Sequence, residues 1–394
     1  METALTPARN GVLARTFSYY WLFICLGLDM AVLGPTLPAL AGQVHASLGQ
    51  MGLLFLAGSI GGVLGTLVSG RVYDRRGGHV VLGTAQLVAA ALIAIVPFTR
   101  WFWLLAAIVV CKGFAQGFVN TGANTLLIWT HGEKSGPFMN GLHFCFGLGA
   151  FLAPFGVAQV LGLEGGYRLA YWGLAAFAGL AGLRMLTLRG SPRQATAGAK
   201  QAAGSGSGAA PYAFVFIAAL FLFFYVGAEI SFGGWIYTYA VKLGLASETG
   251  AAYLNSAFWL SFTVGRLISI LVATRLKPAQ LIPAATAGGL AFLSLALFFP
   301  GSSSALWTAS IGLGFCMAPI WPTGFTLAGQ SIDLSGKLSG LILLGDSIGG
   351  MVLPSALGKV IEAAGPRAMV YLIFTSLGLV LIAFAGMLRL RPKK

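Results

Sequence analysis

The apolar residues of this chain occur in long runs separated by short polar stretches, and twelve runs are long enough to cross the roughly 30 Å core of a bilayer as helices. Backbone groups in lipid must be satisfied within the spanning segment, which favours helices. We see no alternating segments of about ten residues, the pattern of a membrane β-barrel. The predicted spans are residues 16–40, 48–69, 80–98, 102–129, 138–161, 167–187, 212–240, 250–274, 279–299, 304–328, 336–361 and 366–388.

A stretch rich in Gly, Ser and Ala at residues 190–211 interrupts this pattern, and its composition predicts a flexible linker. We therefore expect three parts: a six-helix bundle at 1–189, a linker at 190–211 and a second six-helix bundle at 212–394. The predicted fold is an all-α membrane protein of twelve transmembrane helices in two bundles.

The two predicted bundles are related by an internal repeat. Gly27-Leu28-Asp29 in the first span matches Gly227-Ala228-Glu229 in the seventh at an offset of 200 residues, and the same offset aligns Gly149 with Gly349. The bundles are thus predicted to be pseudo-symmetric. Parallel repeats of this kind place a transport site between two movable bodies.

The charge pattern predicts the orientation of the chain. The sequence has a formal net charge of +14, although only 9% of its residues are charged. With the N-terminus placed in the cytoplasm, 18 Lys and Arg residues, Arg266 among them, fall on the cytoplasmic side and five on the other, with Lys112 in mid-span. This is the positive-inside asymmetry. We expect both termini and the linker to be cytoplasmic, in a bacterial inner membrane, and no nucleic-acid partner.

Three acidic residues, Asp29, Glu229 and Asp346, fall well inside predicted spans. A charge at bilayer depth costs about 2.5–3.5 kcal/mol on insertion scales, so such groups face protein or water. We interpret them as candidates for coupling transport to H⁺ or Na⁺. The alternative is a structural role, in which the acid is permanently neutral or is paired with Lys112 or His143.

The fourth span carries Lys112, Gln116, Asn120 and Asn124 at successive i+4 spacing, which places them on one helix face. Amides offer both donors and acceptors and suit a hydroxyl-rich solute. We predict that Gln116, Asn120, Asn124 and His143 of the fifth span line a solute site. The alternative for the amides is hydrogen bonding between helices.

Aromatic residues complete the predicted solute site: Trp235, Tyr237 and Trp321. Trp235 follows Gly233-Gly234, a predicted soft point in the seventh span, and Trp321-Pro322 predicts a break in the tenth. Glycine pairs at i+4 spacing, among them Gly61 with Gly65 and Gly113 with Gly117, permit close helix approach, and we interpret them as sliding surfaces between the halves.

The loop after the second span, residues 70–77, reads Gly-Arg-Val-Tyr-Asp-Arg-Arg-Gly and resembles the G-x-x-x-D-R-x-G-R-R/K loop of the major facilitator superfamily. The final two basic positions of that motif are Gly78 and His79 here. The resemblance implies a conformational latch at Gly70, Asp74 and Arg75, which would favour an outward-open state.

Three segments resemble the fucose permease and sodium-dependent glucose transporter branch of that superfamily: residues 120–124, residues 140–154 and residues 227–237. The resemblance implies cation-coupled uptake of sugars. The acid that often opens the first of these motifs is Asn120 here, and the position of a fucose-permease-like acid in the first span is Gly34. Any coupling acid must therefore lie elsewhere.

Other functions are disfavoured by the motifs. We find no HExxH, GxSxG or GxxxxGK[ST] pattern, so we expect no enzyme activity, and short loops argue against a receptor. We expect a monomeric transporter in the lipid bilayer that moves a small polar solute, with H⁺ or Na⁺ as coupling ion and no metal or other cofactor. Proton-coupled drug or metabolite efflux is the alternative, because the sequence does not fix direction.

Overall fold

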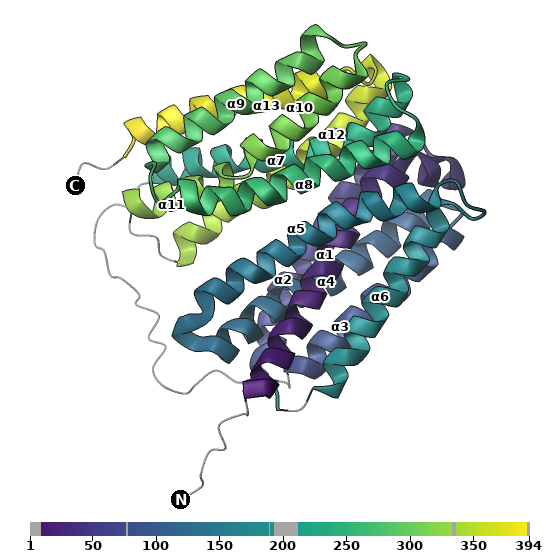
Figure 1. The fold of residues 1–394 in the computed structure, drawn as a ribbon. Coiled ribbons are helices and arrows are strands. Elements are labelled where there is room, and N and C mark those ends of the chain that lie inside the picture. The colour runs from purple at the N-terminus through teal and green to yellow at the C-terminus, as the bar shows by residue number, and fades with distance from the viewer. Residues whose placement is uncertain (1–8, 76–77, 189, 193–211, 333–335, 392–394) are drawn as a thin grey trace, which may run out of the picture.

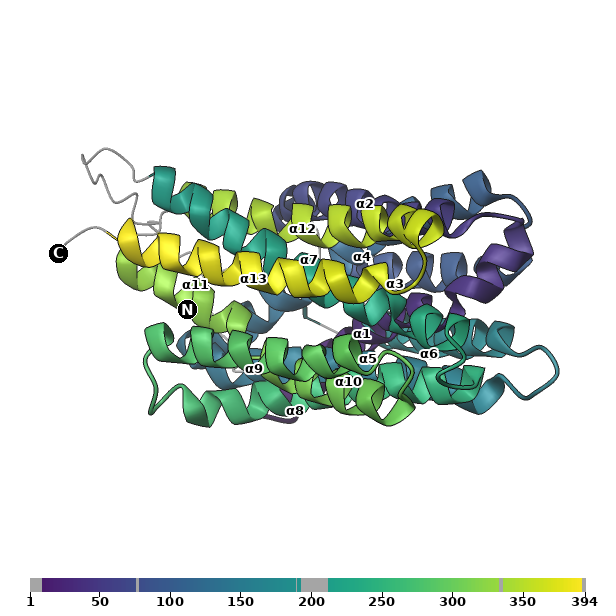
Figure 2. The same cartoon turned by 90° about the horizontal axis from the view of Figure 1, so that it is seen from above.

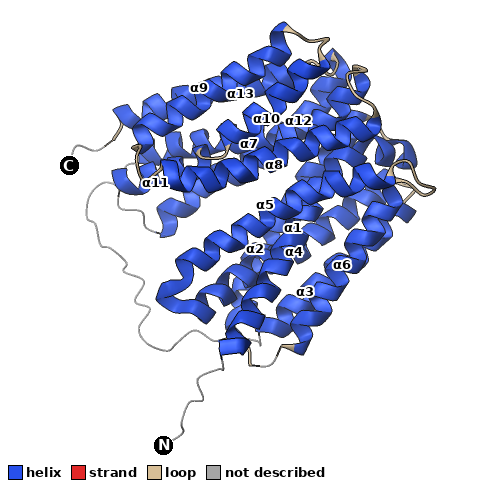
Figure 3. Cartoon of the chain, viewed as in Figure 1, coloured by secondary structure: helices blue, strands red, loops and turns tan. Residues whose placement is uncertain are grey.

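The computed structural model describes residues 9–75, 78–188, 190–192, 212–332 and 336–391, and this part is built of helices and short connections without strands (Figure 3). The helices of the first half are α1 (Arg9–Val44), α2 (Leu48–Arg75), α3 (Gly78–Ile95), η1 (Val96–Phe98), α4 (Phe102–His131), η2 (Gly132–Lys134), α5 (Ser135–Val160) and α6 (Tyr167–Thr187). Those of the second half are α7 (Tyr212–Lys242), α8 (Glu248–Val272), α9 (Pro278–Phe298), α10 (Ser303–Met317), α11 (Ile320–Ser331), α12 (Gly336–Ala364) and α13 (Ala368–Arg389).

Twelve helical segments of the described chain are long and apolar enough to cross a membrane, which confirms the predicted number. The tenth, Ser303–Ser331, consists of α10 and α11. It is interrupted at Ala318-Pro319, next to the predicted break, because Pro319 and Pro322 supply no backbone N–H to a continuous helix. The predicted soft point in α7 does not interrupt that helix, which runs unbroken through Gly233 and Gly234.

The helices form two bundles, α1–α6 and α7–α13 (Figures 1 and 2). Both ends of the described chain lie on the side of the molecule that faces the lower left in Figure 1, which we call the terminal side. The connections α1–α2, α5–α6, α7–α8 and α12–α13 lie at the opposite end, the far side. The two bundles diverge toward the terminal side and meet at the far side.

The internal repeat has a physical basis in close helix contacts. A Cβ added to Gly149 of α5 would lie 2.1 Å from the carbonyl oxygen of Ile24 in α1. A Cβ added to Gly349 of α12 would lie 2.1 Å from the carbonyl oxygen of Phe223 in α7. Both glycines therefore let backbones touch at equivalent helix pairs of the two halves.

We predicted that the glycine pairs form sliding surfaces between the halves, and that prediction was wrong. A Cβ on Gly61 of α2 would meet the carbonyl oxygen of Val110 at 2.0 Å, and one on Gly117 of α4 would meet that of Gly62 at 2.4 Å. These glycines join α2 to α4 inside the first half. Small residues let membrane helices approach closely wherever the helices pack, so the motif alone does not identify the partner.

The outer surface of the described chain presents many large apolar side chains, among them Phe17, Leu271 and Ile382, each at least 65% exposed. In a bilayer this surface faces lipid. Arg266, which we counted among the cytoplasmic cations, instead lies inside the membrane-spanning helix α8.

Candidate functional site: a cavity between the two halves

A cavity of about 820 Å³ lies between the bundles, and it is walled by α1, α2, α4 and α5 of the first half and α7, α8 and α12 of the second. This volume falls within the roughly 300–1,000 Å³ of small-molecule sites. Its first-half wall includes the polar residues Asp29, Lys112, Gln116 and Asn120.

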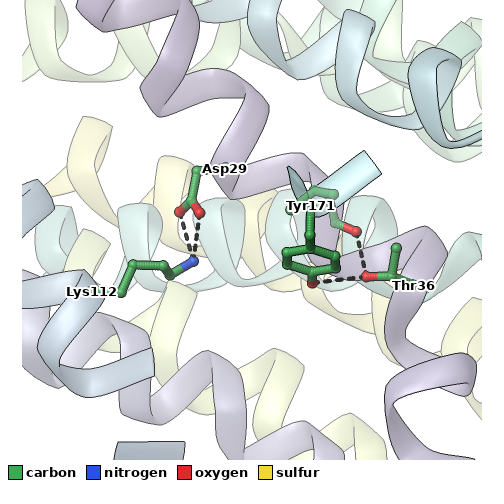
Figure 4. A network of polar contacts seen from close by, with 5 residues as sticks. Asp29, Thr36, Lys112 and Tyr171 are labelled. Carbon is green, nitrogen blue, oxygen red and sulfur yellow. Dashed lines mark hydrogen bonds and ion pairs between the residues drawn. The ribbon is translucent and has the colours of Figure 1, made fainter. Parts of the chain in front are cut away.

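Asp29 and Lys112 form an ion pair on the cavity wall (Figure 4). The Lys112 ammonium donates to both carboxylate oxygens of Asp29 at 2.7 Å. Asp29 is only 3% exposed, whereas the Lys112 side chain is 14% exposed. Asp29 is therefore paired with Lys112, which is the geometry expected for the alternative, structural role. The pair brings together two opposite charges at bilayer depth and connects α1 to α4.

About two turns after Asp29, α1 is fixed against α6. The Thr36 hydroxyl donates to the carbonyl oxygen of Val32 at 2.8 Å and lies 3.0 Å from the Tyr171 hydroxyl (Figure 4). Both Thr36 and Tyr171 are buried. The helix that carries Asp29 is thus held by polar contacts to two neighbours within its own half.

The amides of α4 divide into two groups. Gln116 and Asn120 line the cavity one and two turns from Lys112, as predicted. Asn124 is not among the lining residues; its amide donates to the Asn120 carbonyl oxygen at 2.8 Å and to Asn120 Oδ1 at 3.1 Å. Asn124 therefore positions the Asn120 side chain from the next turn.

The second half contributes Asp346 and Trp259 to the cavity wall. The indole N–H of Trp321 in α11 donates to Asp346 Oδ1 at 2.7 Å, and the Trp321 ring is stacked on Phe325. Trp321 itself is not a lining residue, so it reaches the cavity through Asp346.

Glu229 lies behind this wall rather than on it. It is 8% exposed and does not line the cavity, although its neighbours Val226 and Ile230 do. It interacts with the Tyr225 hydroxyl and with the charges of Arg266 and Asp346.

Arg266 is the residue of this region that the sequence reasoning missed. Its charge acts on Glu229, Asp346 and, across the two halves, His143. Its guanidinium lies 4.6 Å from the ring centre of Phe262, and its buried Nε has no hydrogen-bond partner among the described residues. An Arg inside an apolar span is the signal that could have identified it.

Three further predicted solute residues lie outside the cavity lining. His143 packs edge-on against Phe23 at 5.7 Å. Trp235 is fully buried and donates from its indole to the carbonyl oxygen of Pro354 at 2.9 Å. Tyr237 is 3% exposed.

Of the predicted latch, Gly70 is an exposed residue of α2, and the side chains of Asp74 and Arg75 lie outside the described structure. No group of three or more His, Cys, Asp or Glu residues that could hold a metal ion occurs in the described ranges.

Comparisons with known proteins agree with this architecture. The chain is 30% identical to the sodium-dependent glucose transporter 1A of Mus musculus in an alignment of 398 positions, which covers 91% of this chain and 92% of the relative. The sodium-dependent glucose transporter 1 of Homo sapiens is 29% identical over 392 residues, which cover 90% of this chain and 75% of that protein.

Solved structures show the same fold at low sequence identity. A D-xylose-proton symporter superposes with a TM-score of 0.79 at 15% identity, covering 97% of this chain and 98% of the other. A mutant of the nucleoside transporter NupG gives 0.75 at 15% identity, covering 96% and 99%. The model of the Major Facilitator Superfamily matches residues 19–354, and the chain therefore belongs to this family of membrane transporters.

Proposed function

We propose that this protein carries a small, hydroxyl-rich solute of the sugar type across the cytoplasmic membrane by alternating access. The observation that carries the proposal is the cavity between the halves, with Gln116 and Asn120 on the first-half wall and Asp346 and Ser347 on the second-half wall. Amides supply paired donors and acceptors for hydroxyl groups, and the half-buried rings of Phe55 and Phe146, which also line the cavity, suit the apolar face of a sugar ring. The glucose-transporter names of the sequence relatives support the same class.

The proposed transport is coupled to H⁺ or Na⁺, and the charge distribution favours the second half as the coupling element. Asp29 is balanced by Lys112 within one ion pair. Glu229 and Asp346 instead share the influence of a single cation, Arg266. With both acids ionised, these three charges sum to −1 at bilayer depth, and a bound proton or sodium ion would neutralise the excess.

The terminal side is proposed to be cytoplasmic on the asymmetry of Lys and Arg. The bundles diverge toward that side and touch at the far side, which supports an inward-open state under this orientation.

Uptake into proteoliposomes tests the proposal. Purified protein would be assayed with radiolabelled monosaccharides under an imposed inward H⁺ or Na⁺ gradient, with protein-free liposomes and ionophore-collapsed gradients as controls. We expect accumulation of at least one sugar that one of the two gradients drives. Absence of any sugar flux, together with proton-driven movement of an apolar drug, would refute the sugar assignment in favour of efflux.

A further inference from the structure

The far side of the molecule holds a carboxylate that joins the two halves. Glu362, near the end of α12, accepts a hydrogen bond from the Ser47 hydroxyl at 2.8 Å and one from the Gly49 backbone N–H at 2.7 Å. Ser47 immediately precedes α2 and Gly49 is the second residue of that helix, in the other half. We call Glu362, Ser47 and Gly49 the far-side clasp.

The start of α2 is suited to such a partner. The first N–H groups of a helix have no partner within the helix and carry the positive end of its dipole. Part of this need is met locally, since the Ser47 N–H donates to Gln50 Oε1 at 2.9 Å and the Gln50 N–H donates to Ser47 Oγ at 3.3 Å. The Gly49 N–H is satisfied from the second half, by the charged Glu362.

The backbones beside the clasp are in contact. A Cβ added to Gly52 of α2 would lie 2.7 Å from the carbonyl oxygen of Ser355, and one added to Gly358 of α12 would lie 2.8 Å from that of Leu48. Any larger residue at these glycines would push the halves apart.

A second seam on the same side joins α5 to α8. The Gln159 amide donates to the Tyr253 hydroxyl at 2.6 Å, and the Ser256 hydroxyl donates to the carbonyl oxygen of Phe151 at 2.9 Å. These contacts join neutral groups, whereas the hydrogen bonds of the far-side clasp have a charged acceptor, the Glu362 carboxylate.

We propose that Glu362 is a positioning residue of the transport cycle: by capping α2 from the opposite half, it holds the far side closed and favours the inward-open state. The inference rests on alternating access in the proposed function. Opening the far side must break both hydrogen bonds, while opening the terminal side leaves them intact. A contact made in only one of two states shifts the equilibrium toward that state.

Hydrogen–deuterium exchange of the full-length protein in lipid nanodiscs, without solute, tests this role. We expect Glu362→Ala to raise exchange several-fold at residues 44–54 and 355–364, and to lower it at the terminal-side segments 126–138 and 262–275, because opening one side closes the other. Glu362 is exposed, so the variant should fold.

Gly52→Val should act in the same direction by wedging the helices. Glu164→Ala, an exposed acid on the far-side α5–α6 connection, is the matched control and should change neither segment.

Unchanged far-side exchange in Glu362→Ala would overturn the proposal. So would a rise on both sides, since this is what mere loosening of the structure would produce. Neither result depends on a transported solute, so the clasp and the sugar assignment can fail separately.

Discussion

Removal of one partner from the Asp29–Lys112 pair should destabilise the protein more than removal of both. At the observed 2.7 Å, opposite unit charges attract by about 6 kcal/mol at an effective dielectric constant of roughly 20. Taking each ion out of water opposes this by several kcal/mol, so the net value of the pair is small, yet an orphaned buried charge costs about 3–5 kcal/mol.

The two single variants should differ, because the orphaned groups differ. Lys112→Met leaves a carboxylate that is 3% exposed, and we expect a loss of about 3–5 kcal/mol. Asp29→Asn leaves a lysine that is 14% exposed and whose long side chain can reach toward the cavity, so its loss should be smaller. The double variant should lie within about 2 kcal/mol of the parent.

Equilibrium unfolding in one fixed detergent, followed by tryptophan fluorescence, measures these differences. Lys242→Met and Glu164→Gln change exposed charges and should stay within about 0.5 kcal/mol of the parent. If the double variant loses the sum of the two single losses, the residues do not interact and the ion-pair reasoning is wrong.

The remaining predictions concern transport. Glu229→Gln should abolish gradient-driven accumulation while solute counterflow persists, because the amide copies the protonated acid; unchanged accumulation would assign coupling elsewhere. Arg266→Gln should leave both nearby acids without their shared cation and lower transport under either gradient, measured as initial uptake rate; parental rates would contradict this. Trp321→Phe removes the indole donor to Asp346 and should weaken transport by roughly 5–10-fold, the equivalent of about 1–1.5 kcal/mol for one lost hydrogen bond; an unaffected rate would show that this contact is dispensable.

The sequence was sufficient for the helices and the repeat because both follow from local composition. Runs of apolar residues fix the spans, and Gly149 and Gly349 recur at the same offset because each meets a neighbouring backbone. Trp321-Pro322 likewise predicted an interruption in the tenth span, which the structure has a few residues earlier, between α10 and α11.

The site was only partly predictable, because side-chain direction and partners depend on packing between distant helices. The i+4 series correctly placed Gln116 and Asn120 on the cavity, but the slow drift of a helix face turned Asn124 away. Trp235 follows two glycines, a position that we interpreted as suited to stacking on a ligand. Its indole N–H instead donates to the carbonyl oxygen of Pro354. Arg266 was counted with the cytoplasmic cations although it lies inside the predicted span 250–274, because the sequence does not show that its side chain is packed among the acids of the second half.

Counterflow of radiolabelled sugar tests the central claim, that the cavity between the halves is the solute site. Proteoliposomes preloaded with unlabelled sugar would be diluted into trace label, an assay that reports carrier exchange without any ion gradient. The account predicts a transient overshoot for the parent and a reduction of about tenfold or more for Gln116→Leu, which removes the amide from the cavity wall. Gln330→Leu, the same change at an exposed residue of α11 outside the cavity lining, should retain the parental overshoot. An equal overshoot in Gln116→Leu and the parent would contradict the account.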